Sequence, residues 1–429
     1  MNISKEFKQP SSVYRGKPFW AWNGKMNADE ARRQLRIFKH MGLGGGFMHS
    51  RVGLGTPYLS DEWFDVIKAC VAEAREQNME AWLYDEDRWP SGAAGGLVTE
   101  NPKYRMRYLT LSVEEPKSVK LTGKELEVFL ADIDGCAARN VRRANKKSIK
   151  NTNGNEKALV FIIEEETPSP WFNNQTYLDT LSQEAVATFI ATTHEAYARE
   201  IGDEFSKRVP GVFTDEPNYG SHQFRNEKGR VSWTGILPNV FKKRYGYTLN
   251  TVLPELFFVV DDRQFSTVRR DYYDCITHLF VNHFARQIFE WCEEHHLKFT
   301  GHVLCEETLS SQTHVVGSAM RFYEYMQAPG IDILCGEGLS RPGGAKPEYL
   351  TAKQCCSVLN QFGRTWMLSE LYGCTGWHFT LAEHKAVGDW QAALGVNLRC
   401  QHLAYYTMQG QAKRDYPASI SYQSPWARD

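Results

Sequence analysis

The sequence lacks the features that mark several large classes of protein. Lysine plus arginine (50) nearly equals aspartate plus glutamate (51), so no net charge favours nucleic acid or an anionic membrane surface. No stretch reaches the roughly 18 apolar residues that a membrane span needs, and the start of the chain has no apolar signal segment. The ten cysteines form no CxxC pair. We therefore expect a cytoplasmic protein with reduced thiols and with neither nucleic-acid nor membrane partners.

Short apolar segments alternate with helical patterns along most of the chain. Asn27 and Ser60 each precede a helical pattern and are typical N-cap residues, and a further helical pattern begins at Ser182. The predicted strands are residues 17–23, 44–51, 80–87, 211–217, 298–307, 331–337, 366–370 and 397–406. Eight strands, each followed by a helix, predict an α/β protein with a (β/α)8 TIM barrel. Only residues 407–429 follow the last strand, so we expect a barrel that is incomplete there, or a fragment of a longer chain.

The alternation breaks between residues 104 and 170. Three runs in this region, 108–113, 126–132 and 158–163, alternate apolar and polar residues and are separated by charged turns. This pattern is typical of an antiparallel sheet with one solvated face. The sequence therefore predicts a first part of the catalytic barrel in residues 1–103, a small β-rich insertion in residues 104–170, and the remainder of the barrel in residues 171–429.

Acidic residues end most of the predicted barrel strands. They are Asp85, Glu86, Asp87, Asp215, Glu216, Glu306, Glu307, Glu337 and Glu370. In a TIM barrel these strand ends meet at one face, and crowding raises the pKa of some carboxyl groups while others stay ionised. Glycoside hydrolysis needs that division between acid and base. We predict Glu216 and Glu370 as the catalytic pair, with Glu307 or Glu306 as the alternative base.

Aromatic and polar residues near the same strand ends predict sugar binding, because flat rings stack on sugars and polar groups bind hydroxyls. The predicted substrate-binding residues are Trp22, Asn23, His49, Arg51, Tyr84, Asp85, Glu86, Trp89, Asp215, His302, Trp377 and His378. Any single tryptophan is more simply explained as core, and His302 could equally be an interior histidine. The sequence requires no cofactor, although the acidic mouth could hold calcium. Nothing in it indicates an oligomeric state.

Longer motifs run through the predicted strand ends. They are Pro18-Phe-Trp-Ala-Trp-Asn-Gly24, Gly46-Phe-Met-His-Ser-Arg-Val-Gly-Leu-Gly-Thr56, Trp82-Leu-Tyr-Asp-Glu-Asp-Arg-Trp-Pro-Ser-Gly-Ala-Ala-Gly-Gly96, Phe213-Thr-Asp-Glu-Pro217, Ser369-Glu370, Asp389-Trp390 and Gly395-Val-Asn397. These segments resemble glycoside hydrolase family 106, the α-L-rhamnosidases, from about residue 17 to the end. The resemblance implies a catalytic (β/α)8 barrel that hydrolyses terminal α-L-rhamnose with inversion. By position Glu216 would be the acid, and Glu370 or Glu307 the base.

Other hypotheses explain the same residues. A truncated or decayed relative could bind carbohydrate through its tryptophans without cleaving it, and a retaining glycosidase could act on another sugar. Inversion predicts carboxyl groups about 6.5–9.5 Å apart and retention about 5–5.5 Å. A metal-dependent hydrolase is disfavoured, because the first six predicted strands lack the histidine spacing that zinc prefers.

Overall fold

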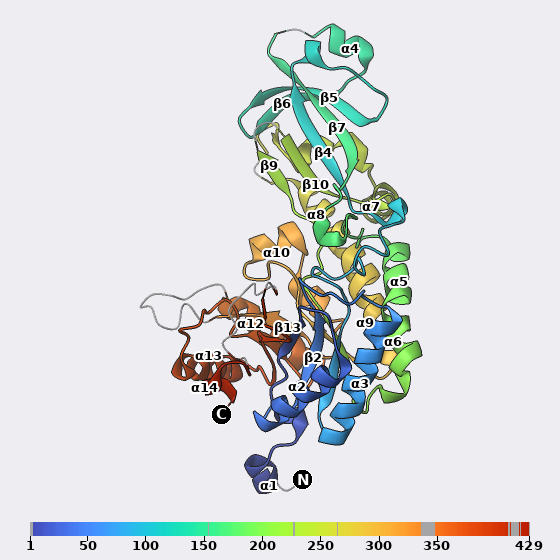
Figure 1. Ribbon diagram of the computed structural model, residues 1–429. Helices are drawn as coiled ribbons and strands as arrows, with labels where there is room; N and C mark the ends of the chain where they lie inside the picture. The colour runs from blue at the N-terminus through green and yellow to red at the C-terminus, as the bar shows by residue number, and fades with distance from the viewer. Residues whose placement is uncertain are drawn as a thin grey trace.

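The computed structural model describes residues 3–152, 154–225, 228–263, 265–335, 348–410, 412, 420 and 422–428. Parallel sheets with helices around them form one end of the molecule, and an antiparallel lobe forms the other (Figure 1). The larger parallel sheet has the order β12-β8-β3-β2-β1-β16. Its strands are β1 (Phe19–Trp22), β2 (Gly45–Ser50), β3 (Glu80–Tyr84), β8 (Gly211–Thr214), β12 (Lys298–Gly301) and β16 (Ala404–Tyr405). The smaller one joins β13 (Gly330–Asp332), β14 (Leu368–Leu371) and β15 (Leu398–Gln401).

The two parallel sheets share one interior. Side chains from both, including Phe19, Phe47, Phe213, Leu368 and Leu398, form a single buried cluster. The strands therefore curl around a common core as a half-barrel. The predicted (β/α)8 barrel is present only in part, because β12 and β13 form no strand ladder among the described residues. One reason is local: Pro329, just before β13, has no N–H to donate.

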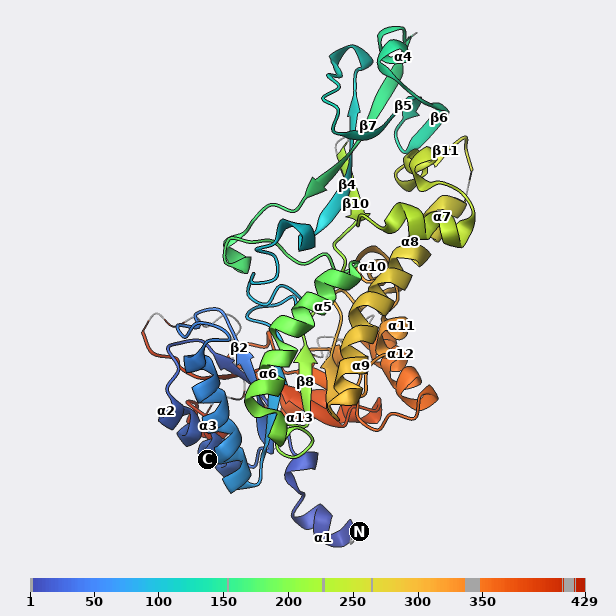
Figure 2. The ribbon, with the colours of Figure 1, turned by 90° about the vertical axis from the view of Figure 1, so that its right-hand side faces the viewer.

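The helices lie around the parallel strands. They are α2 (Ala28–His40), α3 (Asp61–Gln77), α5 (Gln183–Thr192), α6 (His194–Ile201), α8 (Thr267–Phe280), α9 (Arg286–Glu294), α10 (Leu309–Val315), α11 (Ala319–Tyr323), α12 (Glu348–Gln361) and α13 (Leu381–Ala393), with a π-helical turn at Val281–Ala285. The side chains of Asn27 and Ser60 cap α2 and α3 as predicted, and Ser182 caps α5, each accepting a backbone hydrogen bond in the first turn. Figure 2 shows α3, α6, α5 and α9 side by side on one flank.

The lobe is a seven-stranded sheet with the order β11-β6-β5-β7-β4-β10-β9. Its strands are β4 (Arg107–Glu114), β5 (Glu125–Asp134), β6 (Ala137–Arg143), β7 (Glu156–Glu165), β9 (Gln223–Arg225), β10 (Lys228–Trp233) and β11 (Val259–Val260). The predicted insertion ended at residue 170, but the sheet also includes three strands that follow β8. Strands β9 and β10 pair with each other, β10 also pairs with β4, and β11 pairs with β6. These strands therefore complete the edges of a sheet begun earlier in the chain. Helix α7 (Leu237–Tyr245) lies at the base of the lobe (Figure 2).

The remaining elements are short. They are α1 (Ile3–Lys8), α4 (Lys146–Lys150), α14 (Pro425–Arg428), and 3-10 helices at Ser12–Tyr14, Pro102–Tyr104, Pro116–Ser118, Pro170–Phe172, Gly202–Glu204, Leu249–Thr251 and Leu253–Leu256. None of the helices in the described part of the chain combines the length and apolar character that crossing a membrane requires.

Candidate functional site

Strand β8 ends at Thr214 and delivers two acids to the carboxyl edge of the parallel sheet. Ser91 fixes the first of them: its N–H donates to the Asp215 carbonyl at 2.8 Å, and its hydroxyl accepts from the Asp215 N–H at 2.8 Å. The next residue, Glu216, has φ +49°, a left-handed conformation that costs a non-glycine residue on the order of 1 kcal/mol. Strained residues of this kind cluster at functional sites. The chain therefore turns sharply at Glu216.

His302 joins two of the predicted acids. It follows Gly301, whose φ of +116° and closeness to the Thr214 carbonyl leave no room for a side chain. His302 Nε2 lies 3.0 Å from a Glu370 carboxylate oxygen and 3.3 Å from an Asp215 oxygen. The other Glu370 oxygen lies 3.3 Å from His402 Nε2. All four side chains are buried, so residues from the ends of four strands meet in one hydrogen-bonded group.

Burial alone would lower the pKa of His302, but the carboxyl groups of Asp332, Asp215 and Glu370 raise it well above its usual value. Burial also raises the pKa of Glu370 to about 7, against the opposing effect of the His302 hydrogen bond. Tyr84 supports the other acid, because its hydroxyl donates to Asp215 Oδ2 at 2.7 Å. The group is therefore a histidine cation held between two acids.

A second pair of acids lies beside this group. Glu306 accepts hydrogen bonds from the Tyr323 hydroxyl and, at 2.5 Å, from the Asp332 N–H. Burial raises the pKa of Glu306 to about 7. Asp332, the last residue of β13, is in register with Glu370 on β14. Five carboxyl groups, those of Asp215, Glu216, Glu306, Asp332 and Glu370, thus surround His302.

Two of these five carboxyl groups are not engaged by the protein. Among the residues that the structure describes, neither Glu216 nor Asp332 has a hydrogen-bond or ion-pair partner for its side chain, and Asp332 Oδ1 is buried without one. Burial, and then the charge of Asp215, raises the pKa of Glu216 to about 8. Burial, and then Glu370, raises the pKa of Asp332 well above its usual value. Glu216 therefore favours the protonated form near neutral pH.

Arg51 borders the acids on the side of β2. Its guanidinium nitrogens lie 2.8 Å from His49 Nε2 and 3.4 Å from His402 Nε2, and its guanidinium stacks over the Trp89 ring at 4.5 Å. Burial, and then the Arg51 charge, lowers the pKa of both histidines well below the usual value. The predicted residues His49, Arg51 and Trp89 therefore lie together, with one positive charge among neutral rings.

The loop after β3 is organised by two other predicted residues. Both oxygens of the buried Glu86 carboxyl accept from backbone N–H groups, those of Asp87 (2.8 Å), Gly92 (2.9 Å), Ala94 (2.8 Å) and Gly95 (2.5 Å). Asp85 accepts from the Ser91 hydroxyl at 2.6 Å. These contacts place Glu86 and Asp85 as supports of the loop that fixes Asp215.

Trp22 and Asn23 lie away from the acids. Side chains alternate between the two faces of a strand, and Trp22 falls on the helix-facing side, fully buried with its ring 4.9 Å from that of Trp63. It is a core residue in this structure and has no surface for stacking on a sugar. The Asn23 amide exchanges hydrogen bonds with the backbone of Thr407, at 2.8 and 3.0 Å.

Three more predicted residues are exposed. Trp377 and His378 lie in the loop between β14 and α13, and the Trp377 side chain is 48% exposed. Glu307 is exposed, with its carboxylate 3.5 Å from the Ser311 hydroxyl, whereas its neighbour Glu306 points into the acidic group. The structure thus brings Glu370 but not Glu307 into the buried group. Glu337 lies outside the described residues.

Four residues at the site were not predicted. Asp332 ends a strand inside an apolar run, a signal that the sequence did contain. His402 lies inside the segment predicted as the last strand, which the structure divides into β15 and β16. Tyr323 and Ser91 support the acids from a helix and a loop, and no pattern of spacing indicates them.

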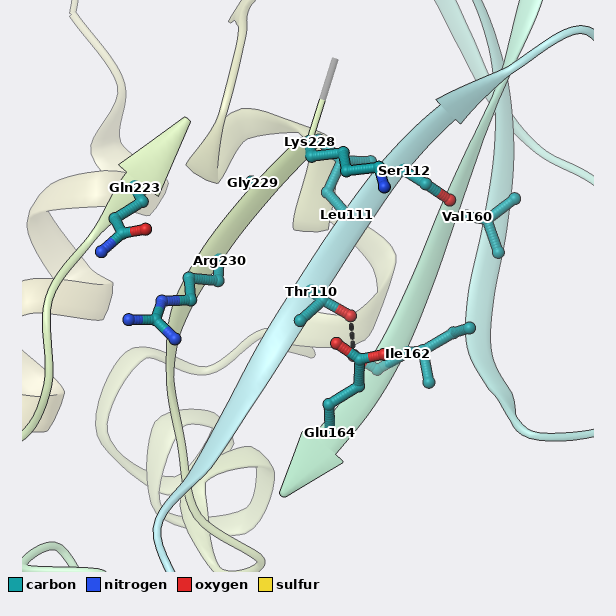
Figure 3. Close-up of a pocket in the computed structure, with 10 residues that line it drawn as sticks. All are labelled: Thr110, Leu111, Ser112, Val160, Ile162, Glu164, Gln223, Lys228, Gly229 and Arg230. Atoms are coloured by element: carbon teal, nitrogen blue, oxygen red, sulfur yellow. Dashed lines mark hydrogen bonds between the residues drawn. The ribbon is translucent and has the colours of Figure 1, made fainter. Parts of the chain in front are cut away.

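One pocket adjoins this region, and another lies on the lobe. One, of about 370 Å³, adjoins the acids through Arg51 and is lined also by Asp87, Arg88 and Asn173 and the glycine-rich loop at 53–58. The other, of about 360 Å³, lies on the open face of the lobe between β7, β4 and β10 (Figure 3). No predicted site residue lines the pocket on the lobe. The pocket beside Arg51 is therefore the better candidate for a sugar residue.

Asp215, His302 and Glu370 also offer three ligand atoms within 4.8 Å of one another, an arrangement that could hold a metal ion. Calcium usually takes six to eight oxygen ligands, whereas this set has two oxygens and a nitrogen. The set fits calcium incompletely, and the chemistry below is derived from the side chains alone.

Comparisons relate this chain to known proteins. A family model described as alpha-L-rhamnosidase, glycoside hydrolase family 106, matches residues 164–410. A solved rhamnosidase from Novosphingobium sp. PP1Y is similar in fold, with a TM-score of 0.70 and 14% identity over 100% of this chain. The chain spans 59% of the length of that protein. A β-galactosidase from the psychrophilic Marinomonas ef1 aligns with 92% of this chain and 55% of its own, at a TM-score of 0.48 and 10% identity. No curated protein matches.

Proposed function

The chain belongs to glycoside hydrolase family 106, the alpha-L-rhamnosidases, and on this premise we propose that it hydrolyses terminal α-L-rhamnosides. The observation that carries the proposal is the group of five carboxyl groups around His302 at the ends of the parallel strands. A glycosidase needs one carboxyl that is protonated near neutral pH and another that can accept a proton.

Glu216 is the proposed general acid. Its pKa is raised to about 8, and its carboxyl has no partner among the described residues, so its proton is available to a leaving oxygen. As the glycosidic bond breaks, Glu216 transfers this proton to the departing oxygen and becomes a carboxylate. The negative charge then lies near the His302 cation, which stabilises it.

Glu370 is the proposed general base. His302 and His402 orient its two oxygens, at 3.0 and 3.3 Å, and each oxygen keeps a second lone pair. In the ionised form it can take a proton from a water molecule that attacks the anomeric carbon from the face opposite Glu216, which inverts the configuration. The (β/α)8 barrel and the cytoplasmic location remain predictions from the sequence, and we include both in this proposal.

The test uses a panel of aryl glycosides with the chain as given. We expect hydrolysis of the α-L-rhamnoside above the other sugars, and loss of at least about 10²-fold in kcat for Glu216→Gln and for Glu370→Gln. The exposed Asp65 on α3 supplies a matched control, Asp65→Asn. Product anomers followed by NMR distinguish inversion from retention. Full activity in both glutamine variants would refute the assignment.

A further inference from the structure

We propose that the Asp332 carboxyl binds hydroxyl groups of the terminal sugar and selects substrates that carry them. The inference rests on the proposed function, because it concerns the sugar that Glu216 and Glu370 would act on. Its basis is a comparison of how the five carboxyl groups around His302 are held.

Three of the five are satisfied by the protein itself. Asp215 is held by Tyr84 and His302, and Glu370 by His302 and His402. Glu306 is held by the Tyr323 hydroxyl and the Asp332 N–H. Each of these three residues is at most 5% exposed. These three carboxyl groups therefore support the site and are not available to a ligand.

Glu216 and Asp332 differ from these three residues both in their hydrogen-bond partners and in their exposure. The side chains of Glu216 and Asp332 have no hydrogen-bond or ion-pair partner within the described ranges, and both residues keep part of their surface exposed. A buried polar atom without a partner costs stability, and Asp332 Oδ1 is such an atom. The proposed role of Glu216 as the general acid explains why its carboxyl group has no partner. Asp332 remains as a group that the fold holds ready for a ligand.

Asp332 is also held rigidly. Glu306 Oε1 accepts from its N–H at 2.5 Å, and Tyr323 fixes the other oxygen of Glu306. The Glu306 carbonyl is held in turn by the side chains of Gln312 and Thr351, at 2.7 and 2.9 Å. Because Asp332 is in register with Glu370, its carboxyl lies beside the proposed base on the next strand. Such support fixes a ligand-binding group in position.

The chemistry of the carboxyl points to hydroxyl groups. Either protonation state accepts hydrogen bonds, and the neutral form also donates one, which suits adjacent hydroxyls on a pyranose. A substrate that lacks the contacted hydroxyl would leave Asp332 Oδ1 unpaired in a buried site. We expect discrimination against that analogue of about 10- to 100-fold in kcat/KM.

The experiment combines variants with substrates. Wild-type chain, Asp332→Ala and Asp332→Asn are assayed on an aryl α-L-rhamnoside and on its three monodeoxy analogues, and binding of free L-rhamnose is measured by calorimetry. We expect Asp332→Ala to raise KM and the L-rhamnose Kd by about 10- to 100-fold, with kcat changed much less. For at least one deoxy analogue, the wild-type discrimination disappears in Asp332→Ala. Asp332→Asn keeps the shape of the side chain and one acceptor oxygen. Its KM and Kd should therefore lie between those of the wild type and those of Asp332→Ala.

Several results would overturn the inference. If both variants discriminate against every deoxy analogue as the wild type does, Asp332 does not touch the contacted hydroxyl. If kcat falls by more than about 10³ with the L-rhamnose Kd unchanged, its role is in the chemical step and not in binding. Asp332→Asn keeps the test valid if the alanine variant does not fold. A wild-type chain that neither cleaves rhamnosides nor binds L-rhamnose refutes the proposed function itself. An active wild type whose discrimination against deoxy analogues is unaffected by the Asp332 substitutions refutes only the role of Asp332.

Discussion

Replacing Glu216 by glutamine should change which leaving groups the enzyme can expel. A general acid matters most when the departing oxygen is a poor leaving group, and its removal typically costs about 10²–10⁴ in rate. Methyl α-L-rhamnoside should therefore lose about that factor in Glu216→Gln, whereas the dinitrophenyl glycoside, whose leaving group needs little protonation, should lose much less. Asp65→Asn should leave both rates unchanged.

The same variant should change the pH dependence. With a pKa of about 8, Glu216 is protonated at pH 7, and the rate of the wild type should fall about tenfold for each pH unit above 8. Glu370, with its pKa raised to about 7, should set the acid limb, because it must be ionised to act as the base. Glu216→Gln should lose the alkaline limb and keep the acid limb. An unchanged alkaline limb, or an equal loss for both leaving groups, would refute the reasoning.

Three further predictions concern stability and support. His302→Asn should lower the free energy of unfolding in urea by about 3–5 kcal/mol, because it leaves buried acids without their cation; a change no larger than that of Asp65→Asn would contradict this. The folded pKa values of Glu370 and Glu306, about 7 each, exceed the usual unfolded value near 4.5, so their contribution is full below pH 4.5 and is lost as pH rises through 7. Thermal unfolding should consequently occur at a lower temperature at pH 9 than at pH 7.5, a window above the usual pKa of about 6.5 at which histidines titrate in the unfolded chain. Glu86→Ala should cost about 1–3 kcal/mol and expose residues 87–96 to limited proteolysis, and Glu86→Gln should cost less, because it keeps one acceptor oxygen.

The sequence predicted the strands and their order well, because alternating strands and helices leave a strong periodic signal. Every predicted barrel strand is present, and the caps at Asn27 and Ser60 are confirmed. The edges of the lobe were not predictable in the same way. Strand β10 pairs with β4 across a long stretch of chain, and such pairing depends on tertiary contacts and leaves little trace in local composition.

Some residues of the site were likewise predictable from the sequence and others were not. Glu216 and Glu370 end strands and were identifiable by that position, whereas the choice between Glu306 and Glu307 depended on which of two adjacent side chains points inward. Trp22 was assigned to the substrate, but the two-residue period of β1 turns it toward the helices. Asp332 was not predicted, because a single acid in an apolar run does not show whether its carboxyl group will have a partner in the folded protein.

The pairing of β1 with β16 has a consequence for synthesis of the chain. Trp20 lies in register with Ala404, so this edge of the first parallel strand stays open on the ribosome until residue 404 has emerged. Contacts between such distant residues slow folding, and an open edge can pair with the wrong neighbour. Recombinant yield should consequently depend on chaperone supply and growth temperature more strongly than the final stability of the protein would suggest.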